Sequence, residues 1–111
     1  FIDPERAQLD AAVAAGAPVV ELHTGKYADT EGAVQTEELA RIRAGAEYGR
    51  ELGLVINAGH GLHYRNVKPV ARIPQIVELN IGHSIIARAI FDGLAPAVYE
   101  MKRRMREARE E

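Results

Sequence analysis

The sequence predicts an α/β fold in which parallel strands alternate with helices. Three observations support this prediction: short apolar runs alternate with amphipathic stretches, the links between them are short, and Gly or Pro marks several of the boundaries. The 111 residues suffice for about one domain, and a hydrophobic content of 47% can supply its core. We therefore expect residues 1–111 to belong to a single domain.

Hydrophobic periodicity and helix-capping residues predict the elements in order. Asp3 and Pro4 are a typical helix start, with Asp3 as the N-cap and Pro4 in the first helical position. The polar stretch 25–36 is expected to form a loop, and the helix after it is supported by Glu37 four residues before Arg41. The expected strands are the strand end at 1–3, then 18–24, 54–59 and 76–82; the expected helices are 5–16, 37–52, 83–91 and 95–111, with 67–73 as a short helix or turn.

The side-chain pattern of the strands favours a barrel over an open sheet. Alternate residues of a strand face opposite sides, and each strand has one aliphatic face and one face that carries Glu or Asn. An open sheet covered by helices on both faces needs apolar residues on both, whereas a (β/α)8 TIM barrel accepts polar groups in its lumen near the carboxyl ends of the strands. Because a whole barrel takes about 250 residues, these strands and helices correspond to half a barrel. The pattern rests on Val20 and Leu22 against Glu21 and His23, on Leu54, Ile56 and Ala58 against Val55, Asn57 and Gly59, and on Leu79 and Ile81 against Glu78 and Asn80.

Composition argues against several classes of partner. The formal charge of −2 provides no basic field for nucleic acid or for an anionic membrane. The chain has no Cys, so it has neither disulfides nor thiolate zinc ligands. No apolar run approaches the roughly 20 residues that a membrane helix needs. His60 and His63 have a spacing that suggests a metal pair, but they fall in a loop without a nearby acidic ligand, so we expect no metal site.

Glu21 and His60 are the candidates for chemistry. Glu21 faces the expected lumen, where a carboxylate is costly unless it is paired or used; it is either the partner of an unseen Lys or Arg or a catalytic or substrate-orienting group. His60 follows a strand between Gly59 and Gly61, which allow a sharp turn and the approach of a ligand. Imidazole is the natural proton donor or acceptor near neutral pH, although a plain loop histidine is the alternative. His23 is expected to be a satisfied polar group at the barrel rim.

Gly82 and His83 open a helix directly after a strand. The free N–H groups and the positive dipole end of such a helix bind phosphate, and Ser84 could add a hydroxyl group. In TIM barrels a phosphate site after the last strands, formed by a short extra helix, recurs. The alternative is that Gly82 only provides a tight turn between strand and helix.

Three segments resemble the C-terminal half of the pyridoxine 5'-phosphate synthase family: ELHTGKYAD, NAGHGLHYRNV and ELNIGHSIIARA. The resemblance covers essentially all 111 residues. It implies a (β/α)8 barrel that condenses 1-deoxy-D-xylulose 5-phosphate with 3-amino-2-oxopropyl phosphate to pyridoxine 5'-phosphate, phosphate and water, with no organic cofactor. It also implies a bacterial, cytoplasmic homo-oligomer, typically an octamer, and makes this chain about the last four βα units of the barrel.

Position by position, the resemblance implies that His60 is the proton donor, that Glu21 stabilises charge in the transition state, and that Gly61 contacts the aminoketone phosphate. Gly82 and His83 would bind a substrate phosphate. The family's other catalytic groups, a second histidine and a glutamate that act as bases, belong to the first half of the barrel and have no counterpart in this sequence. We therefore expect the chain alone to be inactive and the N-terminal half of the barrel to be its partner.

Two alternatives remain open. One is another phosphate-binding barrel enzyme of the aldolase or epimerase type, which would need a Schiff-base lysine or metal ligands on the inner face. Lys26 and Lys68 are both expected in loops, which disfavours the lysine chemistry. The other alternative is a non-catalytic half-barrel that only assembles with other chains.

Overall fold

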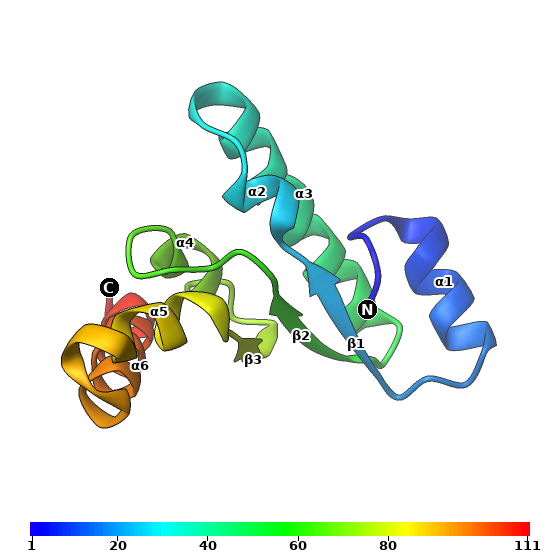
Figure 1. Cartoon of the computed structure of the whole chain (residues 1–111). Coiled ribbons are helices and arrows are strands. Elements are labelled where there is room, and N and C mark those ends of the chain that lie inside the picture. Colours follow the sequence, from blue (N-terminus) through cyan, green and yellow to red (C-terminus); the bar gives the residue numbers. More distant parts are fainter.

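Strands and helices alternate along residues 1–111 in a computed structural model, which confirms the α/β class (Figure 1). The three strands form one parallel sheet. None of the helices combines the length and the apolar character that a membrane span requires. The strands are β1 (Val19–His23), β2 (Val55–Gly59) and β3 (Ile76–Asn80), and the helices are α1 (Arg6–Ala14), α2 (Gly25–Ala28), α3 (Gly32–Glu51), α4 (Val67–Ala71), α5 (His83–Asp92) and α6 (Leu94–Glu110).

The strands lie in sequence order, β1-β2-β3. Because all three are parallel, their carboxyl ends meet at one edge of the sheet. In the register of the sheet, Glu21 lies beside Asn57 and Asn57 beside Glu78. The expected strand at 1–3 is reduced to a single parallel bridge between Ile2 and Leu22. A register shift next to Ile56 leaves Val77 outside the pairing, which puts the aliphatic Ile76 and Leu79 on the same side.

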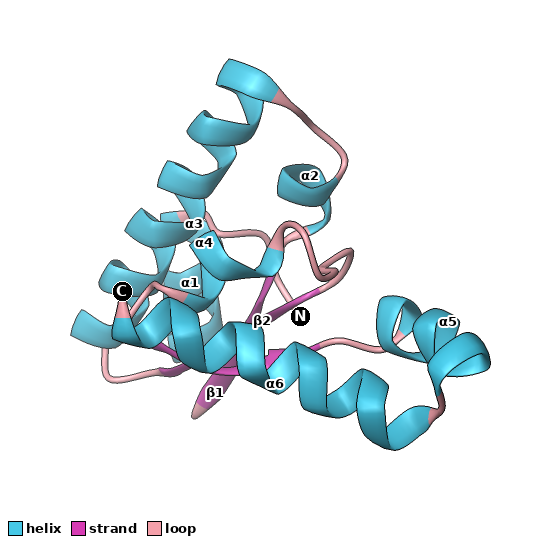
Figure 2. Ribbon diagram, turned by 90° about the vertical axis from the view of Figure 1, so that its left-hand side faces the viewer, coloured by secondary structure: helices cyan, strands magenta, loops and turns pink.

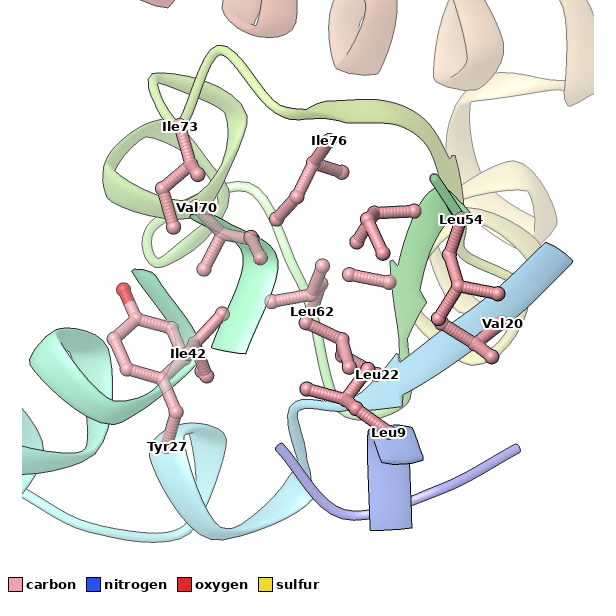
Figure 3. Close-up of a cluster of buried hydrophobic side chains, with 13 residues drawn as sticks. Leu9, Val20, Leu22, Tyr27, Ile42, Leu54, Leu62, Val70, Ile73 and Ile76 are labelled. Carbon is pink, nitrogen blue, oxygen red and sulfur yellow. The ribbon is translucent and has the colours of Figure 1, made fainter. Parts of the chain in front are cut away.

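The hydrophobic core lies between one face of the sheet and the helices α1, α3 and α4, which gather on that side (Figures 1 and 2). Figure 3 shows side chains of α1, α3 and the strands meeting there, among them Leu9, Leu22 and Ile42. Helix α3 packs closely against β2, since a Cβ atom at Gly49 would lie 2.5 Å from Ile56 Cδ1. The aliphatic strand face that the sequence predicts is thus the buried one, and the core lies on this side of the sheet.

Two expected features differ in the structure. Helix α1 begins at Arg6 with Glu5 as its N-cap, because the carboxylate of Asp3 accepts hydrogen bonds from Arg41 of α3 instead. The stretch 25–36, predicted as a loop, forms α2 and the first turns of α3. The Gln35 amide donates to the carbonyl groups of Tyr27 and Thr30 and so closes the link between these helices.

Arg41 connects the start of the chain to α3. Its guanidinium group contacts Asp3 Oδ2 at 3.0 Å and Glu38 Oε2 at 3.1 Å, whereas the predicted pair with Glu37 does not form. The hydrogen bond from Arg41 is the main cause that holds the pKa of Asp3 below its ordinary value. Burial alone would raise the pKa of Glu38, but the hydrogen bonds from Arg41 and Lys26 outweigh it and the pKa is lowered as well.

Replacing Arg41 by Gln should lower the free energy of unfolding at pH 7 by about 1–2 kcal/mol, because two carboxylates lose a charged donor and solvent screens part of the effect. A carboxyl group whose pKa is lower in the folded state stabilises the fold above its unfolded pKa of about 4, and this stabilisation is lost as the pH falls through the folded value. The difference between wild type and Arg41→Gln should therefore shrink between pH 7 and about pH 3. Urea unfolding at both pH values measures it.

The matched control is Arg43→Gln, since Arg43 lies on the exposed side of α3 and makes no salt bridge within 4 Å. Its free energy of unfolding should stay within about 0.5 kcal/mol of wild type at both pH values. A difference between wild type and Arg41→Gln that is as large at pH 3 as at pH 7 would contradict the ionic origin of the stabilisation.

Candidate active site

A pocket of about 720 Å³ opens where the carboxyl ends of the three strands meet. All five site residues predicted from the sequence line it: Glu21, His60, Gly61, Gly82 and His83. Its other lining residues are Phe1, Leu62, His63, Asn80, Ile81 and Ser84. A second pocket of about 570 Å³, between β3 and α6, contains none of the predicted site residues. The fold therefore brings together predicted site residues that are up to 62 positions apart in the sequence, from Glu21 to His83.

The backbone of His60 is held in an unusual conformation. His60 has φ +89°, and it is the only residue other than glycine with positive φ. Such a conformation costs energy and persists where neighbouring groups enforce it. Here the hydroxyl group of the fully buried Thr24 donates a hydrogen bond of 2.7 Å to the carbonyl oxygen of His60. The sharp turn falls on His60 and on Gly61 (φ +79°), as the flanking glycines led us to expect, whereas Gly59 itself remains in β2.

The His60 ring lies next to a second imidazole. The ring centroids of His23 and His60 are 4.8 Å apart, and His23 stacks on Phe1 at 4.6 Å. Nδ1 of His23 accepts the backbone N–H of Gly25 at 2.8 Å, which confirms that His23 is a satisfied polar group. Gly25 is sterically required, because a Cβ atom there would lie 2.3 Å from His23 Cε1 and 2.9 Å from His60 Cδ2.

Glu21 lies half-buried on the polar face of the sheet, opposite the buried Val20 and Leu22. It makes no salt bridge with any Lys or Arg of these 111 residues, so the ion-pair alternative finds no partner within the chain. Instead, Asn80 Nδ2 donates a hydrogen bond of 3.0 Å to Glu21 Oε1. The carboxylate is thus anchored by a neutral amide and remains accessible from the pocket.

The amino end of α5 faces the same pocket. Gly82 is its N-cap, no side chain caps it, and both Gly82 and His83 are exposed. The first N–H groups of a helix have no acceptor within the helix. The Ser84 hydroxyl does not add to this set as we expected, because it donates to the Leu62 carbonyl oxygen at 2.8 Å and so ties α5 to the loop after β2. Free backbone N–H groups and a positive dipole end therefore border the pocket.

His63 lies in the loop between Gly61 and Asn66, which is held by the Asn66 side chain. Asn66 accepts the N–H of His63 at 2.7 Å and donates to the Gly61 carbonyl oxygen at 3.2 Å. Burial, and then the charge of Arg65, lower the pKa of His63. No group of three His, Cys, Asp or Glu side chains is arranged to hold a metal ion.

The two lysines predicted in loops lie in helices instead. Lys26 belongs to α2 and pairs with Glu38 at 3.3 Å, and Lys68 belongs to α4 and pairs with Glu107 at 3.0 Å. Neither lysine lines the pocket. To form a Schiff base with a substrate in this pocket, either lysine would have to leave its carboxylate partner. It would also have to reach the pocket from a different part of the molecule.

Asn80 and Thr24 belong to the site although the sequence predicts no role for them. Asn80 was recognisable as an inward residue at a strand end, but its contact with Glu21 depends on the register of three strands. Thr24 supports His60 across 36 positions of sequence, and nothing in the local sequence signals this contact.

Comparison with known proteins identifies the family. The family described as Pyridoxal phosphate biosynthesis protein PdxJ matches residues 1–107. Proteins named Pyridoxine 5'-phosphate synthase are 61% identical over 111 residues in Pseudoalteromonas translucida, 59% over 110 residues in Photobacterium profundum and 60% over 110 residues in Legionella pneumophila. Each alignment covers 98% of this chain and 44–45% of the relative, so the chain spans a little under half the length of these proteins. These matches confirm the resemblance noted in the sequence, and the chain belongs to the pyridoxal phosphate biosynthesis protein PdxJ family.

Proposed function

We propose that the protein is a pyridoxine 5'-phosphate synthase, a transferase of vitamin B6 biosynthesis. It condenses 1-deoxy-D-xylulose 5-phosphate with 3-amino-2-oxopropyl phosphate and releases pyridoxine 5'-phosphate, phosphate and water. The observation that carries the proposal is the single pocket lined by Glu21 of β1, by His60 and Gly61 after β2, and by Gly82 and His83 after β3. The shared name of relatives about 60% identical supports the same activity.

The proposal includes a (β/α)8 barrel, of which this sheet is the C-terminal half. Two features support it. The strands follow one another in chain order and the core lies on one side of the sheet, against α1, α3 and α4, as in a barrel and unlike an open sheet with a core on both faces. The polar face is layered, since Glu21, Asn57 and Glu78 lie in one row and His23, Gly59 and Asn80 in the next row towards the strand ends. An N-terminal half would close the sheet and contribute the remaining catalytic bases.

Each proposed role follows from position in the pocket. His60 gives a proton to a hydroxyl group that leaves as water, because its exposed ring stands at the pocket on a fixed backbone. The Glu21 carboxylate offsets positive charge that develops in the transition state. The N–H groups at the start of α5, near Gly82 and His83, bind a substrate phosphate. Gly61 lets the aminoketone phosphate approach the backbone, since it carries no side chain.

The proposal also covers the state of the enzyme in the cell. By family resemblance it works in the cytoplasm as a homo-oligomer, an octamer in the typical case, and takes two small phosphorylated substrates without an organic cofactor or a metal. An aldolase-type Schiff base is disfavoured, because Lys26 and Lys68 both pair with carboxylates outside the pocket.

His60→Asn should lower kcat for pyridoxine 5'-phosphate formation by about 10²–10⁴-fold in the full-length protein, because it removes the titrating group. Asn is the suitable replacement, since it tolerates positive φ and should preserve the turn at position 60. The rate should be measured across pH with both substrates. The wild-type rate should fall at high pH, and the variant should not show this fall. A kcat close to wild type, or a loss explained by a lower melting temperature, would reject the proton-donor role.

Gly82→Val should raise the KM for the substrate whose phosphate binds there by about tenfold or more, because a side chain would block access to the first N–H groups of α5. The fold itself should tolerate the change, since φ of Gly82 is −120° and a Cβ atom there would have no neighbour within 4 Å. Steady-state kinetics measure the KM, and thermal unfolding serves as the folding control. A stable variant with unchanged KM would show that this helix end does not bind the substrate phosphate.

A further inference from the structure

The Glu21 carboxylate is held by an amide that belongs to another strand. Glu21 lies on β1 and Asn80 at the end of β3, with β2 between them. The 3.0 Å hydrogen bond from Asn80 Nδ2 to Oε1 is the only hydrogen bond that the Glu21 side chain makes. We propose that Asn80 is the positioning residue that aims the Glu21 carboxylate at the reacting atoms, an inference that rests on the proposed function of this pocket.

Gly59 provides the space for this contact. Glu21 pairs in register with Asn57, whereas Asn80 pairs with Gly59, so the Glu21 side chain must cross β2 at the position of Gly59 to reach Asn80. A Cβ atom at Gly59 would lie 2.5 Å from Glu21 Oε2 and 2.7 Å from the Asn80 carbonyl oxygen. Both distances are far below van der Waals contact, and φ of Gly59 is not positive. Glycine is therefore required here because the Asn80 backbone and the crossing Glu21 side chain leave no room for a Cβ atom, and not because of its backbone conformation.

The sheet contains a second contact of the same chemical kind. Asn57 Nδ2 donates to Glu78 Oε2 at 3.1 Å, one row further from the strand ends, and neither residue lines the pocket. The two pairs use the same residue types on the same face of the sheet. They differ in whether the carboxylate borders the pocket, which makes Asn57 the matched control for Asn80.

Holding the carboxylate matters because a charge stabilises a transition state only from the correct place. A misplacement of about 1 Å can cost up to 10²-fold in rate. With Oε1 bound to Asn80, the rotation of the carboxylate is restricted and Oε2 remains available.

Asn80 also lines the pocket, so it could instead contact the substrate directly. The two roles predict different kinetics for a variant of Asn80. If Asn80 positions Glu21, the variant lowers kcat and only while Glu21 is present. If Asn80 contacts the substrate, the variant raises KM or has the same effect without Glu21.

The test is a double-mutant cycle of Asn80→Leu and Glu21→Gln in the full-length protein, assayed with both phosphorylated substrates. Asn80→Leu should lower kcat by about 10- to 100-fold with KM within about threefold of wild type. In the Glu21→Gln background the same change should cost less than about threefold, since the group that Asn80 positions is already lost. Asn57→Leu should keep kcat within about twofold of wild type. A crystal structure of Asn80→Leu should show the Glu21 carboxylate displaced.

Three outcomes would overturn the proposal: an unchanged kcat in Asn80→Leu, equal losses in both backgrounds, or a rise in KM alone. The crystal structure keeps the test independent of the assay. If the wild-type protein forms no pyridoxine 5'-phosphate, the proposed function fails. If Glu21→Gln retains full activity, the role of Glu21 fails. If the Glu21 carboxylate stays in place in the structure of Asn80→Leu, the positioning role fails whatever the activity. Gly59→Ala gives a second variant, in which Glu21 should be displaced for steric reasons.

Discussion

The parallel, in-register pairing of β1, β2 and β3 is the constraint on which the pocket depends. Because the three strands run in the same direction, their carboxyl ends meet at one edge, and the residues that follow them converge whatever their distance in sequence. The register then decides which side chains are neighbours. Glu21 reaches Asn80 only because Gly59 stands between them, and a shift of one residue would turn every polar side chain to the buried face.

The two faces of the sheet differ in burial and polarity. One face packs against α1, α3 and α4 and buries side chains such as Leu9, Leu22 and Ile42. The other face keeps polar groups accessible towards the strand ends. The unfavourable backbone conformation of His60 is tolerated because the buried Thr24 at the end of β1 binds its carbonyl oxygen, and Thr24 is itself fixed by a backbone hydrogen bond to Gly59. The turn is therefore supported by the sheet rather than by its own sequence.

Much of the fold and of the site was predictable from local patterns. Alternation in VVELH identified the buried face, and the short strand followed by Gly82 and His83 identified the start of α5. Contacts between distant segments were not predictable, because they depend on register and packing. Asp3 was expected to cap α1 but binds Arg41, 38 residues away, and the Ser84 hydroxyl binds the Leu62 carbonyl instead of remaining free. The helices within 25–36 were missed because polar residues there bond to one another's backbone, as Gln35 does.

We propose that one substrate lies across the carboxyl ends of the strands, with its phosphate at the start of α5 and its reacting carbon near His60. A crystal structure of the full-length protein with bound 3-amino-2-oxopropyl phosphate tests this most directly. We expect phosphate oxygens to accept hydrogen bonds from the backbone N–H groups around His83, and the ligand to border Gly61 and the imidazole of His60 as well. A phosphate bound at another place, with this pocket left without ligand at saturating concentration, would rule out this binding mode.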